Sequence, residues 1–490
     1  EILRCLVGSE MCIRDRNYMK RKTHEKRCLY WYKALVLILS VCLIGCQDDK
    51  IGSNGYDPSK PVVFSDFTPD HGSLRTQIHI YGDNFGTDPS KIHITIGGQY
   101  TTTIGCTNTE IYCIVPPKAF DGNIKIKIES ADGKTSPIEY EFEKKFNYTL
   151  QPSVSTLVGS EDENGNSSDV DGNFEKARFG NPQWLLMDTF GIEKCLIING
   201  QGGPIRRINL EAKEVSTLLT NGQGGFRNMQ FMSFDATGDT LFVSDDHGSS
   251  SKDNREIAYI LRSEEFRKAH PYVYDRTGYN NVYCALNKSL YYNTYWKGGL
   301  QKAVHDPTTG GKKGVELFGV YENSDSGTFM CIHPDGRFMY ITGRNCILVS
   351  QYNKVTNEFQ KPTTFAGREG EAGYSPSPGP SARFQEPYQG TFVKNEEYIK
   401  NPRPDGNIYD YYICDRGNHC IFKITPDGNV SLFAGRGSVS SDNKVSGNID
   451  GELKTEARFD NPCGIAYDEE TQTFYIADRE NHSIRTISIE

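Results

Sequence analysis

The sequence predicts an all-β protein, a small antiparallel β-sandwich followed by a six-bladed β-propeller. Two observations predict it. Between residues 61 and 145, apolar and polar residues alternate with a period of two, in runs bounded by Gly, Asp and Pro, which is typical of short strands with one buried face. Between residues 154 and 490 a strand-rich unit recurs six times, and six units of four strands make six blades.

The N-terminal residues are expected to precede the fold. Residues 1–18 resemble a translated sequencing adapter, so Met19 is the expected start of the protein. Residues 19–45 combine a basic stretch with the apolar run "ALVLILSVCLIG", which is shorter than the roughly 20 residues that cross a bilayer. They are predicted to be a signal peptide.

The end of this leader predicts a lipid anchor. The sequence "LIGC", which ends at Cys46, resembles the lipobox of bacterial lipoproteins, in which this Cys is acylated and becomes the new N-terminus. The following "QDDK" resembles the acidic export tag of Bacteroidetes-type surface lipoproteins. The resemblance implies a lipid-anchored outer-membrane protein that faces the cell exterior, with residues 46–60 as a flexible tether.

The net charge and the cysteine pattern disfavour several classes of function. The net charge is -9, and the basic residues concentrate in the leader, which disfavours nucleic-acid binding. No C-x-x-C pair occurs, so the sequence supports neither a zinc site nor a full disulfide framework. Cys106 and Cys113 could pair in an oxidising compartment or remain free thiols. The other cysteines after Cys46 are Cys195, Cys284, Cys331, Cys346, Cys414, Cys420 and Cys463.

The predicted sandwich carries a family resemblance. Residues 61–145 include "TPDHGSLRTQIHIYGDNFG" and "YCIVPP", and on these stretches the segment resembles the IPT/TIG family of immunoglobulin-like domains. The resemblance implies an immunoglobulin-like β-sandwich that acts as a spacer or an interaction module.

The predicted propeller rests on repeated motifs. "KARFGNPQWLLMD" (176–188), "SARFQEPYQGTFV" (381–393) and "EARFDNPCGIAYD" (456–468) share Ala-Arg-Phe, a later Pro and an apolar strand. These motifs resemble the NHL repeat family over residues 154–490. Strands of one type introduce the units: "VSTLVG" (154), "VSTLLT" (215), "PYVYDR" (271), "VELFGV" (315), "TTFAGR" (363) and "VSLFAG" (430).

The ends of the repeat predict how the ring closes. The chain reaches "SIRTISIE" one strand short of a full last blade, while "VSTLVG" is a surplus strand before the first blade. Pairing the two would satisfy both exposed edges, so we expect these strands to meet.

Two turns look like an active site but recur. "CDRGNH" (414–419) and "ADRENH" (477–482) place Asp, Asn and His in the same slots of two blades, between the second and third strands. Asp and Asn hydrogen-bond their own backbone in such turns, and the His can cap a neighbouring carbonyl, so we interpret the set as structural. The set is Asp415, Asn418, His419, Asp478, Asn481 and His482, and the repeat arginines Arg178, Arg383 and Arg458 belong to the same structural class.

No motif predicts a catalytic residue, a metal or a cofactor. The acidic segment 161–175 lacks the Gly and the terminal Glu of an EF-hand and occupies the slot of segment 447–459, which favours an inter-blade loop over a calcium site. His333 falls in a hairpin slot that Asp188, Asp235 and Asp468 hold in other blades, so it is expected to be a turn residue.

Aromatic residues are expected around the propeller axis. Counting four residues back from each hairpin slot gives Trp184, Phe231, Tyr283, Phe329, Gln389 and Gly464 at the starts of the inner strands. Such a ring suits stacking against sugar rings, or else it fills the channel with apolar bulk. The candidate ligand-binding residues are Trp184, Phe231, Tyr283, Phe329, Tyr295, Trp296 and Tyr388, with Tyr295 and Trp296 expected at the rim.

The sequence therefore favours a non-catalytic surface lipoprotein that binds a ligand, most simply a glycan. The combination of the two families resembles accessory proteins of glycan uptake, which implies a TonB-dependent transporter as a partner. A lyase-like or hydrolytic propeller enzyme and a pure protein-interaction scaffold are the alternatives. A carboxylate and His cluster on the axis would favour the enzyme, and exposed aromatics would favour the glycan.

Overall fold

The computed structural model describes residues 55–489, apart from residue 118 and the segments 130–135, 162–164, 166, 247–254, 275–277, 296–297, 322–325 and 438–444. The leader, Cys46 and Trp296 lie outside the described residues. Within them, no helix is long and apolar enough to cross a membrane.

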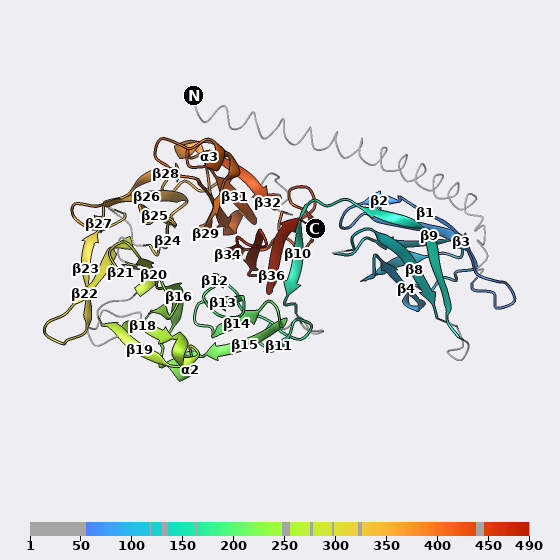
Figure 1. The fold of residues 1–490 in the computed structure, drawn as a ribbon, viewed down its shortest axis with the longest axis horizontal. Helices are drawn as coiled ribbons and strands as arrows, with labels where there is room; N and C mark the ends of the chain where they lie inside the picture. The colour runs from blue at the N-terminus through green and yellow to red at the C-terminus, as the bar shows by residue number, and fades with distance from the viewer. Residues whose placement is uncertain are drawn as a thin grey trace, which may run out of the picture.

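The first domain is a sandwich of two sheets whose strands are mostly antiparallel (Figure 1). One has the order β1-β3-β7-β6 and the other β2-β9-β8-β4-β5. The strands are β1 (Val63–Thr68), β2 (His71–Gly72), β3 (Gln77–Asp83), β4 (Ile92–Ile96), β5 (Gln99–Thr101), β6 (Thr103–Cys106), β7 (Glu110–Ile114), β8 (Gly122–Ile128) and β9 (Ile138–Tyr148). Isoleucines alternate along β3, β4 and β8 and meet in one core with Phe67, Phe142 and Phe146, as the period-two pattern predicts.

Both cysteines of this domain are free thiols. Cys113 lies opposite Thr103, and Cys106 lies opposite Ile111, so the two are offset along neighbouring strands rather than paired. Burial raises the pKa of the Cys113 thiol to about 12, which keeps it protonated and unreactive.

Six four-stranded blades follow, and the all-β prediction of a sandwich and a six-bladed propeller is confirmed (Figure 1). Blade 1 holds β12 (Trp184–Asp188), β13 (Cys195–Asn199), β14 (Ile205–Asn209) and β15 (Glu214–Leu219), with β11 (Gly172–Asn173) on its edge. Blade 2 holds β16 (Met229–Phe234), β17 (Thr240–Asp245), β18 (Arg255–Leu261) and β19 (Ala269–Tyr274). Blade 3 holds β20 (Gly278–Cys284), β21 (Ser289–Thr294), β22 (Leu300–His305) and β23 (Lys312–Phe318).

The second half of the ring has the same pattern. Blade 4 holds β24 (Phe329–Ile332), β25 (Phe338–Gly343), β26 (Cys346–Asn353) and β28 (Thr363–Gly367), with β27 (Glu358–Phe359) beside β26. Blade 5 holds β29 (Pro387–Lys394), β30 (Tyr409–Asp415), β31 (Cys420–Ile424) and β32 (Val430–Ala434). Blade 6 holds β34 (Pro462–Asp468), β35 (Thr473–Asp478), β36 (Ser483–Ile489) and the upstream strand β10 (Pro152–Val158), with β33 (Gly451–Glu452).

The described helices are short connectors. They are the α-helices α2 (Asn221–Gly224) and α3 (Glu396–Lys400) and the 3-10 turns Pro89–Lys91, Arg262–Glu264, Gly379–Ser381 and Arg416–Asn418. The first strand of each blade lies at the centre of the ring, and the fourth lies at its outer edge (Figure 1).

The ring closes as the sequence predicts. Strand β10 pairs antiparallel with β36, with Val154 opposite Ile487 and Pro152 opposite Ile489. The last blade thus takes its outer strand from the beginning of the propeller, and neither strand is left with an open edge on that side. Val154 is fully buried in a cluster with Ile487, Ile476 and Phe459.

Closure makes a stability prediction. Val154→Ala removes two buried methyl groups from the closing strand, so the free energy of unfolding of the propeller should fall by about 2 kcal/mol. Urea denaturation followed by far-UV circular dichroism measures it. The matched control is Val355→Ala, whose side chain is 94% exposed and should change stability by less than about 0.5 kcal/mol. Equal effects in the two variants would contradict the closing role of β10.

Candidate functional site

The two Asp-Asn-His turns have the same geometry in blades 5 and 6. Asp415 accepts hydrogen bonds from the backbone N–H groups of Gln385 (3.1 Å) and Glu386 (2.8 Å), and Asn418 Nδ2 donates to it at 2.7 Å. Asn418 Nδ2 also donates to the carbonyl of Gly373 at 2.8 Å. Each turn therefore holds the loop that leads into its own inner strand.

Blade 6 repeats this arrangement with Asp478 and Asn481. Asp478 accepts from the Asp460 N–H (2.8 Å) and from Asn481 Nδ2 (2.7 Å), which also donates to the carbonyl of Gly447 (2.8 Å). Burial raises the pKa of Asp415 to about 7 and the pKa of Asp478 to about 6. Such shifts often mark catalytic groups, but both carboxyls are fully buried and surrounded by structural donors.

The histidines of these turns join one blade to the next. His419 Nδ1 accepts a hydrogen bond from the Asn461 N–H in blade 6 at 3.1 Å. His482 Nδ1 donates to the carbonyl of Gly180, which leads into blade 1, at 2.9 Å. The geometry fits the structural interpretation of the repeated residues.

The acidic inter-blade loops hold arginines. Arg206 is 1% exposed, and its guanidinium contacts Asp169 (3.1 Å), Asp171 (2.8 Å) and the carbonyl of Val170 (2.7 Å). Arg485 has the same place in blade 6, with Asp478 and Asp450 as its partners. Asp169 and Asp171, two of the carboxylates that looked like calcium ligands, therefore neutralise a buried guanidinium.

The repeat arginines brace their own loops. Backbone bridges join Val170 to Arg178, Ser375 to Arg383 and Ile449 to Arg458, so the three positions are equivalent. Arg458 donates to the carbonyls of Glu456 and Ala457, and Arg383 donates to those of Pro380 and Ala382.

His333 occupies its hairpin in a buried position. Its backbone N–H donates to the Phe338 carbonyl (2.9 Å), and its Nε2 lies 2.9 Å from Asn407 Oδ1. This is the turn position expected from the sequence.

The aromatic residues on the axis form a buried plug. Trp184 (4% exposed), Phe231 (0%), Phe329 (8%) and Tyr388 (5%) belong to one core cluster, and the rings of Phe329 and Tyr388 are 3.9 Å apart. Trp184 Nε1 donates to the Met232 carbonyl (2.9 Å), and the Tyr388 hydroxyl donates to Gln183 Oε1 (3.0 Å). The expectation of a stacking surface is therefore wrong for Trp184 and Phe231, which fill the channel instead.

Gln389 completes the plug with polar contacts. Its Oε1 accepts from the Leu185 N–H (3.0 Å) and the Ile465 N–H (3.2 Å), and its Nε2 donates to the Leu185 carbonyl (2.6 Å). One side chain thus joins blades 5, 1 and 6 at the axis.

Tyr283 is not on the axis, and this expectation is wrong. Its ring stacks on Phe242 at 5.9 Å, between blades 2 and 3. The β20–β21 hairpin closes with Cys284 opposite Ser289, so Asn287 lies inside the turn, and counting back from it gives the wrong position. The axial position belongs to the buried Asn280, and the neighbouring Tyr279 packs on Phe231 and Phe329.

A hollow of about 650 Å³ lies above the plug, at the mouth where the inner strands begin. We call it the axial mouth. Tyr279, Tyr295, Phe329 and Tyr388 line it, together with Gln183, Gln201, Asn345 and Gln385, the arginines Arg344, Arg416 and Arg479, and Glu386. Tyr295 is 55% exposed, as its expected rim position requires. Of the candidate ligand-binding residues, the structure brings Tyr295, Phe329 and Tyr388 together here.

Buried aromatic side chains form the floor of the axial mouth, and charged side chains line its wall. Burial raises the pKa of Tyr279 to about 12 and that of Tyr388 well above its usual value, so both phenols stay neutral hydrogen-bonding groups. The Arg416 guanidinium lies 5.4 Å from the Tyr388 ring centre and binds Glu386 at 2.9 Å. Among the described residues, no group of three or more His, Cys, Asp or Glu is placed to hold a metal ion.

The three arginines were not predicted as ligand-binding residues, although their positions directly after the second strands could have indicated them. Arg416 and Arg479 follow Asp415 and Asp478 inside the repeated turns, and Arg344 follows Gly343 at the end of β25. The turn residues that hydrogen-bond inward are structural, whereas the residue after the Asp lines the mouth.

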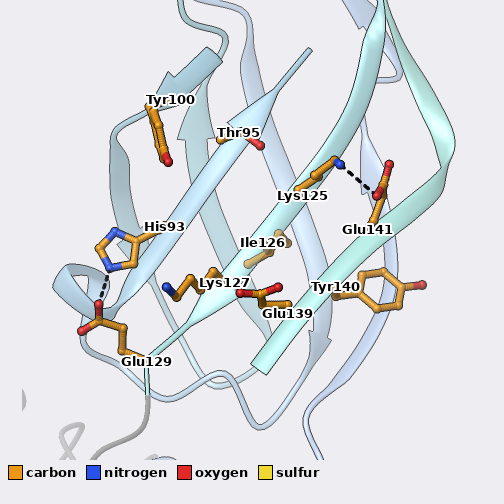
Figure 2. A pocket seen from close by; sticks show the side chains of 10 residues that line it. All are labelled: His93, Thr95, Tyr100, Lys125, Ile126, Lys127, Glu129, Glu139, Tyr140 and Glu141. Atoms are coloured by element: carbon orange, nitrogen blue, oxygen red, sulfur yellow. Dashed lines mark hydrogen bonds and ion pairs between the residues drawn. The ribbon is translucent and has the colours of Figure 1, made fainter. Parts of the chain in front are cut away.

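A second hollow, of about 680 Å³, lies on the sandwich over β4, β8 and β9 (Figure 2). It is the outer face of a sheet whose side chains already pair, with His93 3.0 Å from Glu129 and Lys125 3.1 Å from Glu141. Tyr140 stacks on Phe64 at 4.5 Å, which covers one ring face. The axial mouth is the better candidate site, because side chains from several blades converge on it.

Comparisons with known proteins agree with this architecture. The model of the IPT/TIG domain family matches residues 61–143. NHL repeat-containing protein 2 of Bos taurus is 32% identical over 80 residues, 16% of this chain and 10% of that protein, and the Gallus gallus protein is 27% identical over 113 residues. The chain therefore spans only 10% to 13% of the length of these two curated relatives.

Solved Bacteroides structures match almost the whole chain. An auxiliary nutrient binding protein from Bacteroides thetaiotaomicron is 35% identical with a TM-score of 0.65, over 89% of this chain and 100% of that one. The chain belongs to the same family as this protein. A family member from Bacteroides ovatus, also described as an auxiliary nutrient binding protein, is 30% identical (TM-score 0.62) over 89% of this chain and 100% of that one. Another B. thetaiotaomicron member, described as a candidate phosphatase, is 29% identical (TM-score 0.64) over 89% of this chain and 98% of that one.

The His419 contact predicts a pH-dependent stability. Burial lowers the pKa of His419 below 6.5, against the opposing effect of Asp460. The neutral ring accepts the hydrogen bond from the Asn461 N–H. The unfolded state binds the proton first, so this stabilisation is present at pH 7 and is lost as the pH falls through 6.5 and the folded-state pKa.

The variant His419→Asn tests this, since Asn tolerates the positive φ of 53° at this position. It should cost about 1 kcal/mol at pH 7, and the difference from the wild type should shrink at pH 5. Urea denaturation at the two pH values measures it. A difference that grows on acidification would show that the protonated imidazolium is the stabilising form.

Proposed function

We propose that this protein is a non-catalytic surface protein that captures a nutrient, a glycan, at the axial mouth and serves an uptake system. The observation that carries the proposal is the convergence of tyrosines, amides and guanidiniums on one open hollow above a rigid floor. The family members described as auxiliary nutrient binding proteins support the role.

The lining chemistry suits a sugar. Pyranose rings carry apolar C–H faces that stack on aromatic rings, and their hydroxyls need donors and acceptors such as amides, guanidiniums and phenols. Tyr295 offers an exposed ring at the rim, and Gln183, Gln201 and Gln385 offer amides. The binding groups come from different blades, which the closed ring holds in fixed positions.

Binding fits this lining better than glycoside hydrolysis does. Hydrolysis of a glycosidic bond usually takes two carboxyl groups on either side of the bond. Among the described residues that line the mouth, Glu386 is the one carboxylate, and Arg416 already binds it.

The test at the site is Tyr295→Ala. It should weaken binding of the retained polysaccharide about tenfold and leave the melting temperature unchanged, because the ring is more than half exposed. Affinity gels and a thermal melt measure the two effects. The matched control is Tyr274→Ala, whose ring is 47% exposed on the outer strand β19, away from the mouth, and should change neither. Trp184→Ala, in the plug, should instead cost about 3–5 kcal/mol of stability.

If the wild type retains no polysaccharide on a broad glycan array, the proposal that its ligand is a glycan is wrong. A protein-interaction scaffold is then the better function, since propellers of this kind also present one face to partners.

The proposed cellular location follows from the N-terminal sequence. Acylation of Cys46 would anchor the protein in the outer membrane, with residues 46–60 as a tether, and would place it beside a TonB-dependent transporter. Cys46→Ala should abolish incorporation of labelled fatty acid and release the protein from the membrane fraction. Protease added to intact cells should digest the wild type, and protection there would show that it does not face the exterior.

A further inference from the structure

The wall of the axial mouth carries three arginines at matching places in three consecutive blades. Arg344 follows β25 in blade 4, Arg416 follows β30 in blade 5, and Arg479 follows β35 in blade 6. All three follow the second strand of their blade and line the same hollow. The repeat thus places a guanidinium at the mouth in each of these blades.

Each guanidinium is partly fixed by an acidic or amide neighbour. Arg344 Nε donates to Glu369 (3.0 Å), and Arg416 binds Glu386 through Nε and NH2 (2.9 Å). Arg479 Nε donates to Asn181 Oδ1 (2.7 Å), with Glu480 at 3.4 Å from NH1. These contacts orient the planar groups and so reduce the entropy lost when a ligand binds.

Donors remain for a ligand. Among the described residues, the contacts above use Nε of Arg344 and Nε and NH1 of Arg479, which leaves both terminal nitrogens of Arg344 and NH2 of Arg479 with no protein acceptor. The side chains are 32% and 29% exposed, so a ligand in the hollow can reach them.

The balance of charge in the described lining is positive. It holds three arginines and one glutamate, Glu386, whereas Glu369 and Glu480 lie outside the lining. Arg416 and Arg479 are also close enough to Tyr388 to lower the pKa of its phenol against the effect of burial. Each arginine already has a carboxylate neighbour, so the argument for the ligand rests on the free terminal nitrogens of Arg344 and Arg479. An oxyanion would accept charge-assisted hydrogen bonds from these nitrogens, which are stronger than those to a neutral hydroxyl.

We propose that the axial mouth recognises an acidic saccharide, with Arg344 and Arg479 binding a carboxylate or sulfate on the sugar while the tyrosines contact the ring. This inference rests on the proposed glycan-binding function and names its ligand class. Carboxylate and sulfate share the chemistry that the guanidiniums recognise, and the test separates them.

The experiment uses the mature protein on an array of acidic polysaccharides printed beside their neutralised forms and beside neutral glycans. Polygalacturonate is compared with its methyl ester, and a sulfated galactan with its desulfated form. The wild type should retain acidic polysaccharides and not their neutralised forms, and retention should weaken as salt rises. The methyl ester arm reports a carboxylate ligand, and the desulfated arm reports a sulfate ligand.

Arginine variants test which side chains bind the acidic group of the saccharide. Arg344→Gln and Arg479→Gln should each weaken binding of the acidic polysaccharide about tenfold, because each removes a charge-assisted contact. These two are chosen over Arg416, whose loss would also free Glu386 in the hollow. The control is Arg207→Gln, an exposed arginine on β14, which should not change binding.

The outcomes separate the two proposals. Retention of neutral glycans that Tyr295→Ala weakens and the arginine variants do not would overturn the acidic ligand and leave the glycan site standing. Retention of acidic polysaccharides that survives in both arginine variants would also overturn it. No retention of any polysaccharide, acidic or neutral, would overturn the glycan function and this inference with it.

Discussion

The pairing of β10 with β36 is the constraint on which the rest of the molecule depends. It joins the first and last strands of the propeller over residues 152–158 and 484–489, so all six blades share one ring. The ring fixes the inner strands around an axis. Side chains of these strands fill the axis as the plug, and the axial mouth lies above the plug. Three residues lie between the end of the sandwich at Tyr148 and the start of β10 at Pro152.

Closure explains why one repeated turn can serve two purposes. Asp415 and Asp478 with their Asn partners must hydrogen-bond the neighbouring loop in each blade, because the inner strand that follows carries the axis. The intervening Arg416 and Arg479 also contact such loops, through Glu386 and Asn181, and in addition line the hollow. A repeated turn can therefore hold residues that hydrogen-bond the fold and, between them, residues that line the hollow.

The sequence predicted the blades well because strand periodicity and repeated turns are local signals. The six outer strands, the closing pair and the inward Asp-Asn-His contacts all lie where the motifs place them. The aromatic ring was harder to interpret. Tyr283 was misplaced because the count started from Asn287, which lies inside the blade 3 turn. The depth of Trp184 and Phe231 depends on how tightly six inner strands approach the axis. Exposure of that kind is a property of the assembled ring and not of any one segment.

The division between plug and mouth has a physical consequence for ligand binding. Trp184, Phe231 and Gln389 carry stability through apolar burial and through hydrogen bonds between blades, none of which uses the surface of the hollow. Phe329 and Tyr388 belong to both the plug and the mouth, whereas the exposed Tyr295 at the rim contributes little to the folding free energy and can differ without loss of the fold. A rigid floor also limits the side-chain freedom lost on binding, which favours affinity for a ligand that presents one face and one charge. The arrangement thus lets the turn residues of individual blades change the surface of the hollow while the axis of the ring stays the same.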